Sequence, residues 1–304
     1  MKRLLLTAAA VVALATSAFA ADLKMPVKAA PPPSPWDIAF GGGLASDYIF
    51  RGITQSNHRP SVNAYTELRY NSLPTLQWYG GISGESISFP NRAAAEIDFY
   101  GGVRPTFGPL ALDFGYWYYY YPGGQCFGFG DPTCAPALPN GFAEKADWSF
   151  WEVYAKGTWT INDQWALGFN VFTTPNILNQ GASGTYVSGT AKFTAPAAYA
   201  LFAGQVGWYV SGEFGTQFLG TTDAILGSIA LNDYDTWNVG VGFTWKVFTL
   251  DLRYYDTDMS KADCATFTGA QNAAIGSSGL PESNWCDATF VAKLSFDLTL
   301  ASLK

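Results

Sequence analysis

The chain has 304 residues and a formal net charge of −7, and aromatic residues make up 16% of it while charged residues make up only 13%. A soluble globular domain rarely combines so many aromatic residues with so few charges, and the acidic balance argues against nucleic acid as a partner. No shift in composition divides the chain beyond its first 35 residues, which predicts a single large domain.

Residues 1–20 have the pattern of a secretory signal peptide. Lys2 and Arg3 precede an apolar stretch over residues 4–15, and residues 18–20 (Ala-Phe-Ala) form a small-residue cleavage site. The apolar stretch is too short to cross a bilayer as a helix, so we expect cleavage after residue 20. Residues 21–35 contain five prolines and are expected to form an extended periplasmic segment.

Apolar and polar residues alternate along most of residues 36–304, which is typical of strands with one face toward lipid and the other toward water. The pattern is clear near the C-terminus, where Phe290, Leu294 and Phe296 alternate with Lys293 and Asp297. It predicts an all-β fold, a closed antiparallel transmembrane β-barrel of about 12 strands. The predicted strands cover residues 36–53, 62–71, 76–85, 95–104, 110–121, 149–160, 165–173, 186–194, 205–218, 237–245, 248–255 and 289–298.

The predicted connectors are alternately short and mostly longer. Outer-membrane barrels have short periplasmic turns and long extracellular loops, whereas a β-sandwich has no reason to show this difference. We therefore expect a location in the bacterial outer membrane, reached through the periplasm. The short connectors are residues 72–75, 105–109, 161–164, 195–200 and a hairpin near 246, and the others are residues 54–61, 86–94, 122–146, 174–185, 219–232 and 256–286.

The four cysteines lie in two close pairs within the long connectors, Cys126 with Cys134 and Cys264 with Cys286. An exported chain meets an oxidising compartment, so two local disulfides are the simplest expectation, although four cysteines allow three pairings. Neither pair has the ligand spacing of a zinc site, and no metal or cofactor is expected.

The alternation also predicts which charged residues face the lumen. Facing charges of both signs would set ion preference in an open pore, or would pair and fill a narrow one, and a barrel of this size lies between the two cases. Asp47 and Arg51 share a predicted strand face and are read either as pore lining or as an internal ion pair. The pore-lining candidates are Asp47, Arg51, Glu67, Arg69, Glu96, Asp98, Arg104, Asp113, Glu152, Lys156, Glu213, Asp251, Arg253 and Lys293, and Lys192, Lys246 and Asp297 are predicted to face inward with them.

The single histidine, His58, is the residue on which an enzymatic alternative depends. Some outer-membrane barrels are lipid hydrolases that use a serine and a histidine. His58 lies in the predicted first outer loop, where we expect a surface-exposed imidazole, and the sequence contains no Gly-x-Ser-x-Gly motif. We therefore predict that the protein is not an enzyme and contains no catalytic residues.

Residues 43–56 (GLASDYIFRGITQS) resemble the N-terminal signature of the TorF-type porins, a largely uncharacterised proteobacterial family. Residues 96–101, 115–123 and 152–154 resemble further parts of that family, although the chain continues for eight residues after Phe296 instead of ending on an aromatic residue. The resemblance implies an outer-membrane barrel without defining a substrate.

These observations predict a porin-like channel for the passive passage of ions or small polar solutes. Its expected partners are outer-membrane lipid and those solutes, and the sequence leaves the oligomeric state undetermined. The alternatives are a structural or adhesive barrel without conductance and, ranked behind it, an outer-membrane lipid hydrolase.

Overall fold

The computed structural model describes residues 34–130, 132–277 and 279–303. The predicted signal peptide, residues 1–20, lies outside the described residues, as does the proline-rich segment apart from its last two residues. A compact unit starts at Pro35 and contains the rest of the chain.

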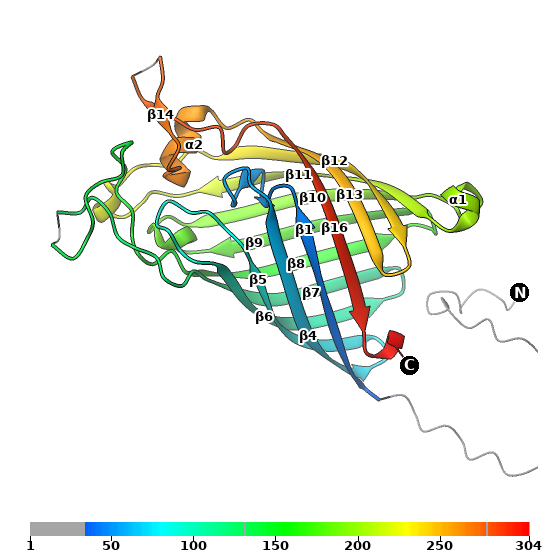
Figure 1. Cartoon of the computed structure of the whole chain (residues 1–304). Helices are drawn as coiled ribbons and strands as arrows, with labels where there is room; N and C mark the ends of the chain where they lie inside the picture. The colour runs from blue at the N-terminus through cyan, green and yellow to red at the C-terminus, as the bar shows by residue number, and fades with distance from the viewer. Residues whose placement is uncertain (1–33, 131, 278, 304) are drawn as a thin grey trace, which may run out of the picture. The chain divides into compact units, whose positions relative to one another are not determined.

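Twelve strands of this unit form a closed barrel, as predicted (Figure 1). Each strand pairs antiparallel with its neighbour in the sequence of barrel strands, and the first strand closes the barrel against the last. The strands are β1 (Trp36–Ala45), β4 (Ser61–Leu73), β5 (Leu76–Glu85), β6 (Glu96–Phe107), β7 (Leu110–Tyr120), β8 (Phe150–Thr160), β9 (Trp165–Thr174), β10 (Gly184–Thr194), β11 (Gly207–Leu219), β12 (Tyr234–Trp245), β13 (Phe248–Thr257) and β16 (Thr289–Thr299).

The remaining elements are short. No helix in the described ranges is both long and apolar enough to cross a membrane. The elements are the paired strands β2 (Ile49–Phe50) and β3 (Ile53–Thr54), the pair β14 (Ala274–Ile275) and β15 (Pro281–Glu282), the helices α1 (Leu201–Gly204) and α2 (Lys261–Thr268), and the 3₁₀ helices η1 (Ile177–Asn179), η2 (Ala197–Tyr199), η3 (Ala224–Leu226) and η4 (Ala301–Leu303).

The alternation of apolar and polar residues in the sequence gives the barrel an apolar outer face and a polar inner face. On β13, Leu250 and Leu252 point outward and are about 40% exposed, while Asp251 and Arg253 point into the barrel and bond to each other. On β16, Phe290 is 79% exposed on the outside. A belt of exposed apolar side chains around a closed barrel is the surface that a bilayer covers.

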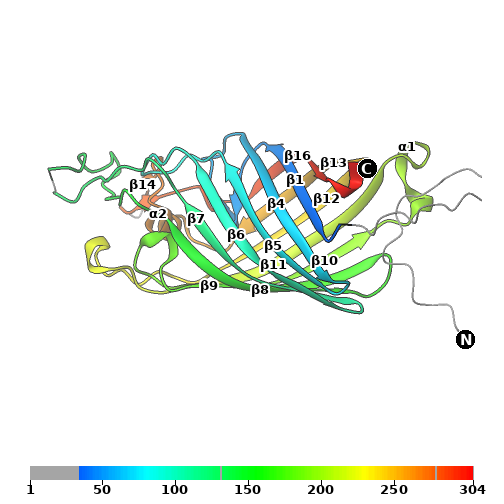
Figure 2. The same ribbon diagram turned by 90° about the horizontal axis from the view of Figure 1, so that it is seen from below.

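The connectors differ at the two ends of the barrel, as the sequence predicts. At one end the strands are joined by tight turns, such as residues 74–75, 108–109 and 246–247, with one longer connector that carries α1. At the other end the connectors are longer and carry α2, β14 and β15 (Figure 1 and Figure 2). We call these the short-turn end and the long-loop end.

Glycines on the inner face give room to tyrosine rings on the adjacent strand. Tyr209 of β11 pairs in register with Gly242 of β12, and a Cβ atom at residue 242 would overlap the Tyr209 ring. Tyr100 of β6 lies over Gly81 of β5 in the same way. The rings therefore lie against the wall, which leaves space in the middle of the barrel.

The predicted first strand is too long, because β1 ends at Ala45. Residues 46–60 turn inward, and β2 and β3 form a hairpin whose two turn residues, Arg51 and Gly52, both have positive φ. Residue 52 must be glycine, since a Cβ atom there would overlap Thr236 on the barrel wall. We call residues 46–60 the inner hairpin. The alternation of apolar and polar residues continues from β1 into this segment, which is why the sequence predicts one strand over residues 36–53.

Candidate functional site

The structure brings the strand-borne charges of the predicted set to the inner wall. They pair with one another, bond to inward side chains or line internal cavities, and they are Glu67, Arg69, Glu96, Asp98, Arg104, Asp113, Glu152, Lys156, Glu213, Asp251, Arg253 and Lys293. Lys192 lies over the Tyr209 ring and Asp297 accepts a hydrogen bond from Tyr65, so both also face inward. Lys246 does not, because it lies in the turn between β12 and β13. That these residues line a conducting pore remains a prediction.

Five of these charges form one network toward the short-turn end. Arg104 binds Glu67 through two hydrogen bonds of 2.8 and 2.9 Å, and Arg69 Nε adds a third at 2.5 Å. Asp113 continues the network, 3.3 Å from Arg104 Nε and 3.8 Å from Lys156 Nζ. Basic and acidic side chains from four strands (β4, β6, β7 and β8) therefore meet on the inner wall, and all of them except Glu67 remain partly exposed.

Three carboxyl groups gather at the long-loop end, from Glu85, Glu96 and Asp98. One oxygen of each lies within 4.8 Å of the others. Glu85 and Glu96 are direct cross-strand partners, a pairing that is unfavourable when both are ionised. Tyr48 and Tyr121 donate hydrogen bonds to Glu96 at 2.6 and 2.9 Å. An all-oxygen set suits a hard cation such as Ca²⁺, and shared protons would relieve the same repulsion. The sequence shows the acids but not their register, so this cluster was not predicted.

The tip of the inner hairpin is fixed by a buried ion pair. Arg51 donates two hydrogen bonds to Glu152 of β8, at 2.6 and 2.9 Å, and one of 2.9 Å to Gln217 of β11. The exposed fractions of the Arg51 and Glu152 side chains are 5% and 0%. The guanidinium also lies over the rings of Phe172 and Tyr186, at 5.1 and 4.7 Å from their centroids. Arg51 therefore connects the hairpin to several strands of the barrel wall, β8 to β11.

The base of the inner hairpin is organised around Asp47. Asp47 accepts hydrogen bonds from Thr54 at 2.5 Å and from Ser56 at 2.8 Å, and it lies 2.8 Å from His58 Nδ1. Asp47 and Arg51 do not share a strand face, as was expected, and do not form the ion pair that was one of the two interpretations, because the hairpin turn sends Arg51 to Glu152 and leaves Asp47 at the base.

The expectation of a freely exposed imidazole at His58 is also wrong. Its side chain is 29% exposed, and its second nitrogen, Nε2, lies 3.1 Å from the carbonyl oxygen of Asn284. Since a carboxylate and a carbonyl can only accept, a doubly protonated ring satisfies both contacts. The hydrogen bond to Asp47 raises the pKa of His58 above 6.5, while partial burial opposes this shift.

The long connectors bury a hydrophobic cluster above the hairpin. Phe89, Trp148, Phe267 and Trp285 are each at least 95% buried and come from three connectors, and Ile53 of the hairpin packs with them. We call this cluster the cap.

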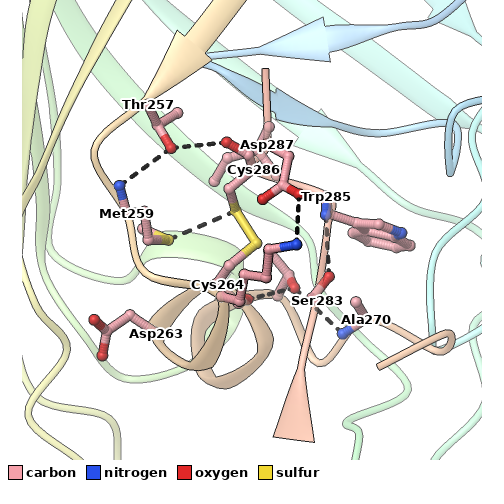
Figure 3. Close-up of a disulfide and its surroundings, with 12 residues drawn as sticks. Thr257, Met259, Asp263, Cys264, Ala270, Ser283, Trp285, Cys286 and Asp287 are labelled. Atoms are coloured by element: carbon pink, nitrogen blue, oxygen red, sulfur yellow. Dashed lines mark hydrogen bonds and ion pairs between the residues drawn. A yellow bond between two sulfur atoms is a disulfide. The ribbon is translucent and has the colours of Figure 1, made fainter. Parts of the chain in front are cut away.

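Each of the two disulfides joins two residues of the same connector. Cys126 is bonded to Cys134 and Cys264 to Cys286, which is the simplest of the three pairings. Figure 3 shows the second disulfide, which joins α2 to the segment that leads into β16. Thr257, at the end of β13, donates a hydrogen bond of 2.9 Å to the carbonyl oxygen of Cys286 and so connects this segment to the barrel wall.

Beneath the hairpin the lumen is not filled. A cavity of about 490 Å³ borders Arg51 and is lined by charged side chains that include Glu213 and Arg253. A second cavity, of about 430 Å³, reaches the short-turn end. Lys156 and Asn170 line both, so the two cavities share a wall. The barrel therefore contains open space lined by charged side chains below a hairpin and an apolar cap.

Among solved structures, several barrels are similar at low identity. The NanC porin is 8% identical with a TM-score of 0.44, over 86% of this chain and 100% of that chain. An outer membrane channel from Pseudomonas putida is 10% identical with a TM-score of 0.41, over 91% and 100%. LpxR from Salmonella typhimurium is 9% identical with a TM-score of 0.40, over 85% and 99%. These values carry no argument about activity.

Sequence comparison gives a family but no characterised relative. None of the curated proteins matches the chain. The resemblance to the TorF-type porins remains a prediction. Residues 29–281 match the model of Gcw_chp, described as a bacterial protein of unknown function, and the chain belongs to this family.

Proposed function

We propose that the protein is an outer-membrane channel for ions or small polar solutes, closed at its long-loop end by the inner hairpin. The observation that carries this proposal is the position of Arg51, buried against Glu152 directly above a charged cavity of about 490 Å³. A structural barrel without conductance needs neither an open, charged interior nor a separate segment folded across it.

The lumen has the chemistry of a passage for polar solutes. Its charges have both signs and lie close together on nearby strands, as in the network of Glu67, Arg104 and Asp113. Such an arrangement orients water and solutes and sets ion preference. The exposed apolar belt and the unequal connectors support a bilayer location with the long loops outside the cell.

The inner hairpin has the properties of a movable barrier. Its chain leaves the barrel wall after β1 and rejoins it at β4, and the polar contacts of Arg51 hold its tip together with the packing of Ile53 in the cap. Removal of one partner of a buried ion pair destabilises by about 3–5 kcal/mol, because the other charge is left without compensation. Loss of the Arg51 contact should therefore release the hairpin while the strand pairing of the barrel persists.

The test is a comparison of ion conductance in planar bilayers between Arg51→Gln and a matched variant, Arg59→Gln. Arg59 lies in the same segment but its side chain is exposed and has no ion pair among the described residues. We expect Arg51→Gln to raise the fraction of time spent conducting at least about tenfold, given the cost of an unpaired Glu152. Arg59→Gln should behave as the unmodified protein does.

The cap favours one alternative, a structural barrel without conductance, because it covers the same end as the hairpin. A variant that lacks residues 49–54 separates the two functions. If this variant and Arg51→Gln both fold into vesicles and both remain silent, the channel proposal is wrong.

A further inference from the structure

A third pocket lies among the long connectors. Its volume is about 310 Å³, and it is lined by residues of the connectors between β7 and β8, β9 and β10, and β11 and β12, and by the end of α2. Most of its wall is apolar, and this part consists of Trp148, Leu178, Ile225, Leu226, Ile229 and Leu231. A pocket of this size is at the lower end of the range for small-molecule sites.

Glu144 is the polar centre of this pocket. The residue is only 5% exposed, and paired backbone hydrogen bonds of 2.9 Å to Phe127 fix its position. Its carboxyl group lies against Gly269, the left-handed residue that ends α2, where a Cβ atom would overlap a carboxyl oxygen. Within the described ranges the carboxyl group has no hydrogen bond or ion pair. A carboxyl group buried without a partner is costly, so this one calls for an explanation.

The other polar side chains of the pocket either are hydrogen-bond acceptors or already have partners. Gln180 is 8% exposed, and its Oε1 is buried without a partner among the described residues. Its Nε2 donates a hydrogen bond of 3.0 Å to the carbonyl oxygen of Phe267, which fixes the direction of the amide. Lys145 is the one base in the lining, and it binds Asp223 and the carbonyl oxygen of Asn179. The pocket thus offers a ligand the Glu144 carboxyl group, and its one base is already paired.

Burial also changes the protonation of the Glu144 carboxyl group. Desolvation raises the pKa of Glu144 to about 9, so the group carries a proton at neutral pH when the pocket holds no ligand. A cation brought beside it would favour the ionised form and release that proton.

We infer that this pocket binds a small organic cation, a primary amine with an aryl or short alkyl body. The ammonium group would donate to Glu144, and the apolar body would lie along Trp148 and Ile225. An ammonium group also gains from the face of a tryptophan ring. This inference does not rest on conductance, because Arg51, Glu152 and Gln217 are not among the residues that line the pocket.

The probe is 2-phenylethylamine, with 2-phenylethanol as its uncharged counterpart, and binding to the whole protein in detergent is measured by calorimetry at pH 7. We expect the amine to bind at least tenfold more tightly than the alcohol. Titrations in buffers of different ionisation enthalpy should show release of close to one proton for each amine bound.

Two variants locate the interaction. Glu144→Gln keeps the shape of the side chain and should weaken amine binding at least tenfold without changing the affinity for the alcohol. Asp147 lies on the same connector but outside the pocket lining, so Asp147→Asn should change neither the affinity for the amine nor the affinity for the alcohol. Equal affinity for amine and alcohol, amine binding that survives Glu144→Gln, or no heat with either probe would each overturn the inference.

Discussion

His58 is held between two groups that can only accept hydrogen bonds, so its protonation is coupled to the inner hairpin. The bond to Asp47 raises the pKa of His58 above 6.5, against the opposing effect of burial, and Asp287 adds a weaker attraction. A raised folded-state pKa contributes stability that is complete below the unfolded value and is lost as the pH rises through the folded one. The hairpin should therefore be most firmly held in acid and loosen as the pH rises.

This coupling can be measured directly because His58 is the single histidine of the chain. Its imidazole resonances, followed by NMR in detergent micelles, should titrate with a midpoint above 6.5. In planar bilayers the conducting fraction of the unmodified protein should increase across the same pH interval, and His58→Gln should remove this increase. A midpoint at or below 6.5 would contradict the assignment of the Asp47 contact as the dominant influence.

At the scale of single residues, the sequence predicts the face of the strand on which a side chain lies. It does not predict contacts between residues that are far apart in the chain. It predicts that Glu67 and Arg104 face the lumen, because alternation along a strand is local. The partner of His58 Nε2 is Asn284, 226 positions away, and no local pattern indicates it. The same limit explains why Arg51 was assigned to a strand face beside Asp47.

Among the elements, the segment of residues 258–288 depends on one covalent link. The disulfide between Cys264 and Cys286 spans 22 positions and joins α2 to the approach to β16. A crosslink over a loop of this length removes unfolded-chain entropy worth about 3 kcal/mol. We expect the double variant Cys264→Ser/Cys286→Ser to be cleaved faster by added protease within residues 258–288.

The first disulfide supplies the matched control. Cys126 and Cys134 lie on another connector, so replacing both by serine should leave cleavage of residues 258–288 unchanged. The barrel of both variants should keep its folded mobility on gels run without heating. Equal cleavage rates in the two variants would show that the cap holds the segment without the second disulfide.

The elements that sequence patterns predict are those that a bilayer constrains. All twelve barrel strands were expected near their observed positions, since lipid on one side imposes the period of two. The short elements at the long-loop end meet no such constraint. α2 nevertheless has a local signal, because Ser260 caps its first turn and bonds to Asp263 three residues later. The inner hairpin has only the Arg51-Gly52 turn as a clue.

For the whole molecule, the two faces of the wall predict different tolerances to charge. Leu252 lies midway along β13, points outward at 42% exposure, and is flanked in register by Val241 and Ala292. Thr249 lies on the same strand but lines an internal cavity with Asp251. A lysine facing the bilayer midplane costs about 2–4 kcal/mol, whereas a lysine facing the lumen can keep its hydration.

We therefore expect Leu252→Lys to lower the free energy of unfolding from lipid vesicles by about 2–4 kcal/mol, and Thr249→Lys to change it by less than about 1 kcal/mol. Urea titrations followed by tryptophan fluorescence measure both values under one set of conditions. Because the two substitutions introduce the same side chain three residues apart, their difference reports the medium that each face meets. Equal losses would mean that the outward face does not meet hydrocarbon, and the membrane assignment, with the channel that depends on it, would be wrong.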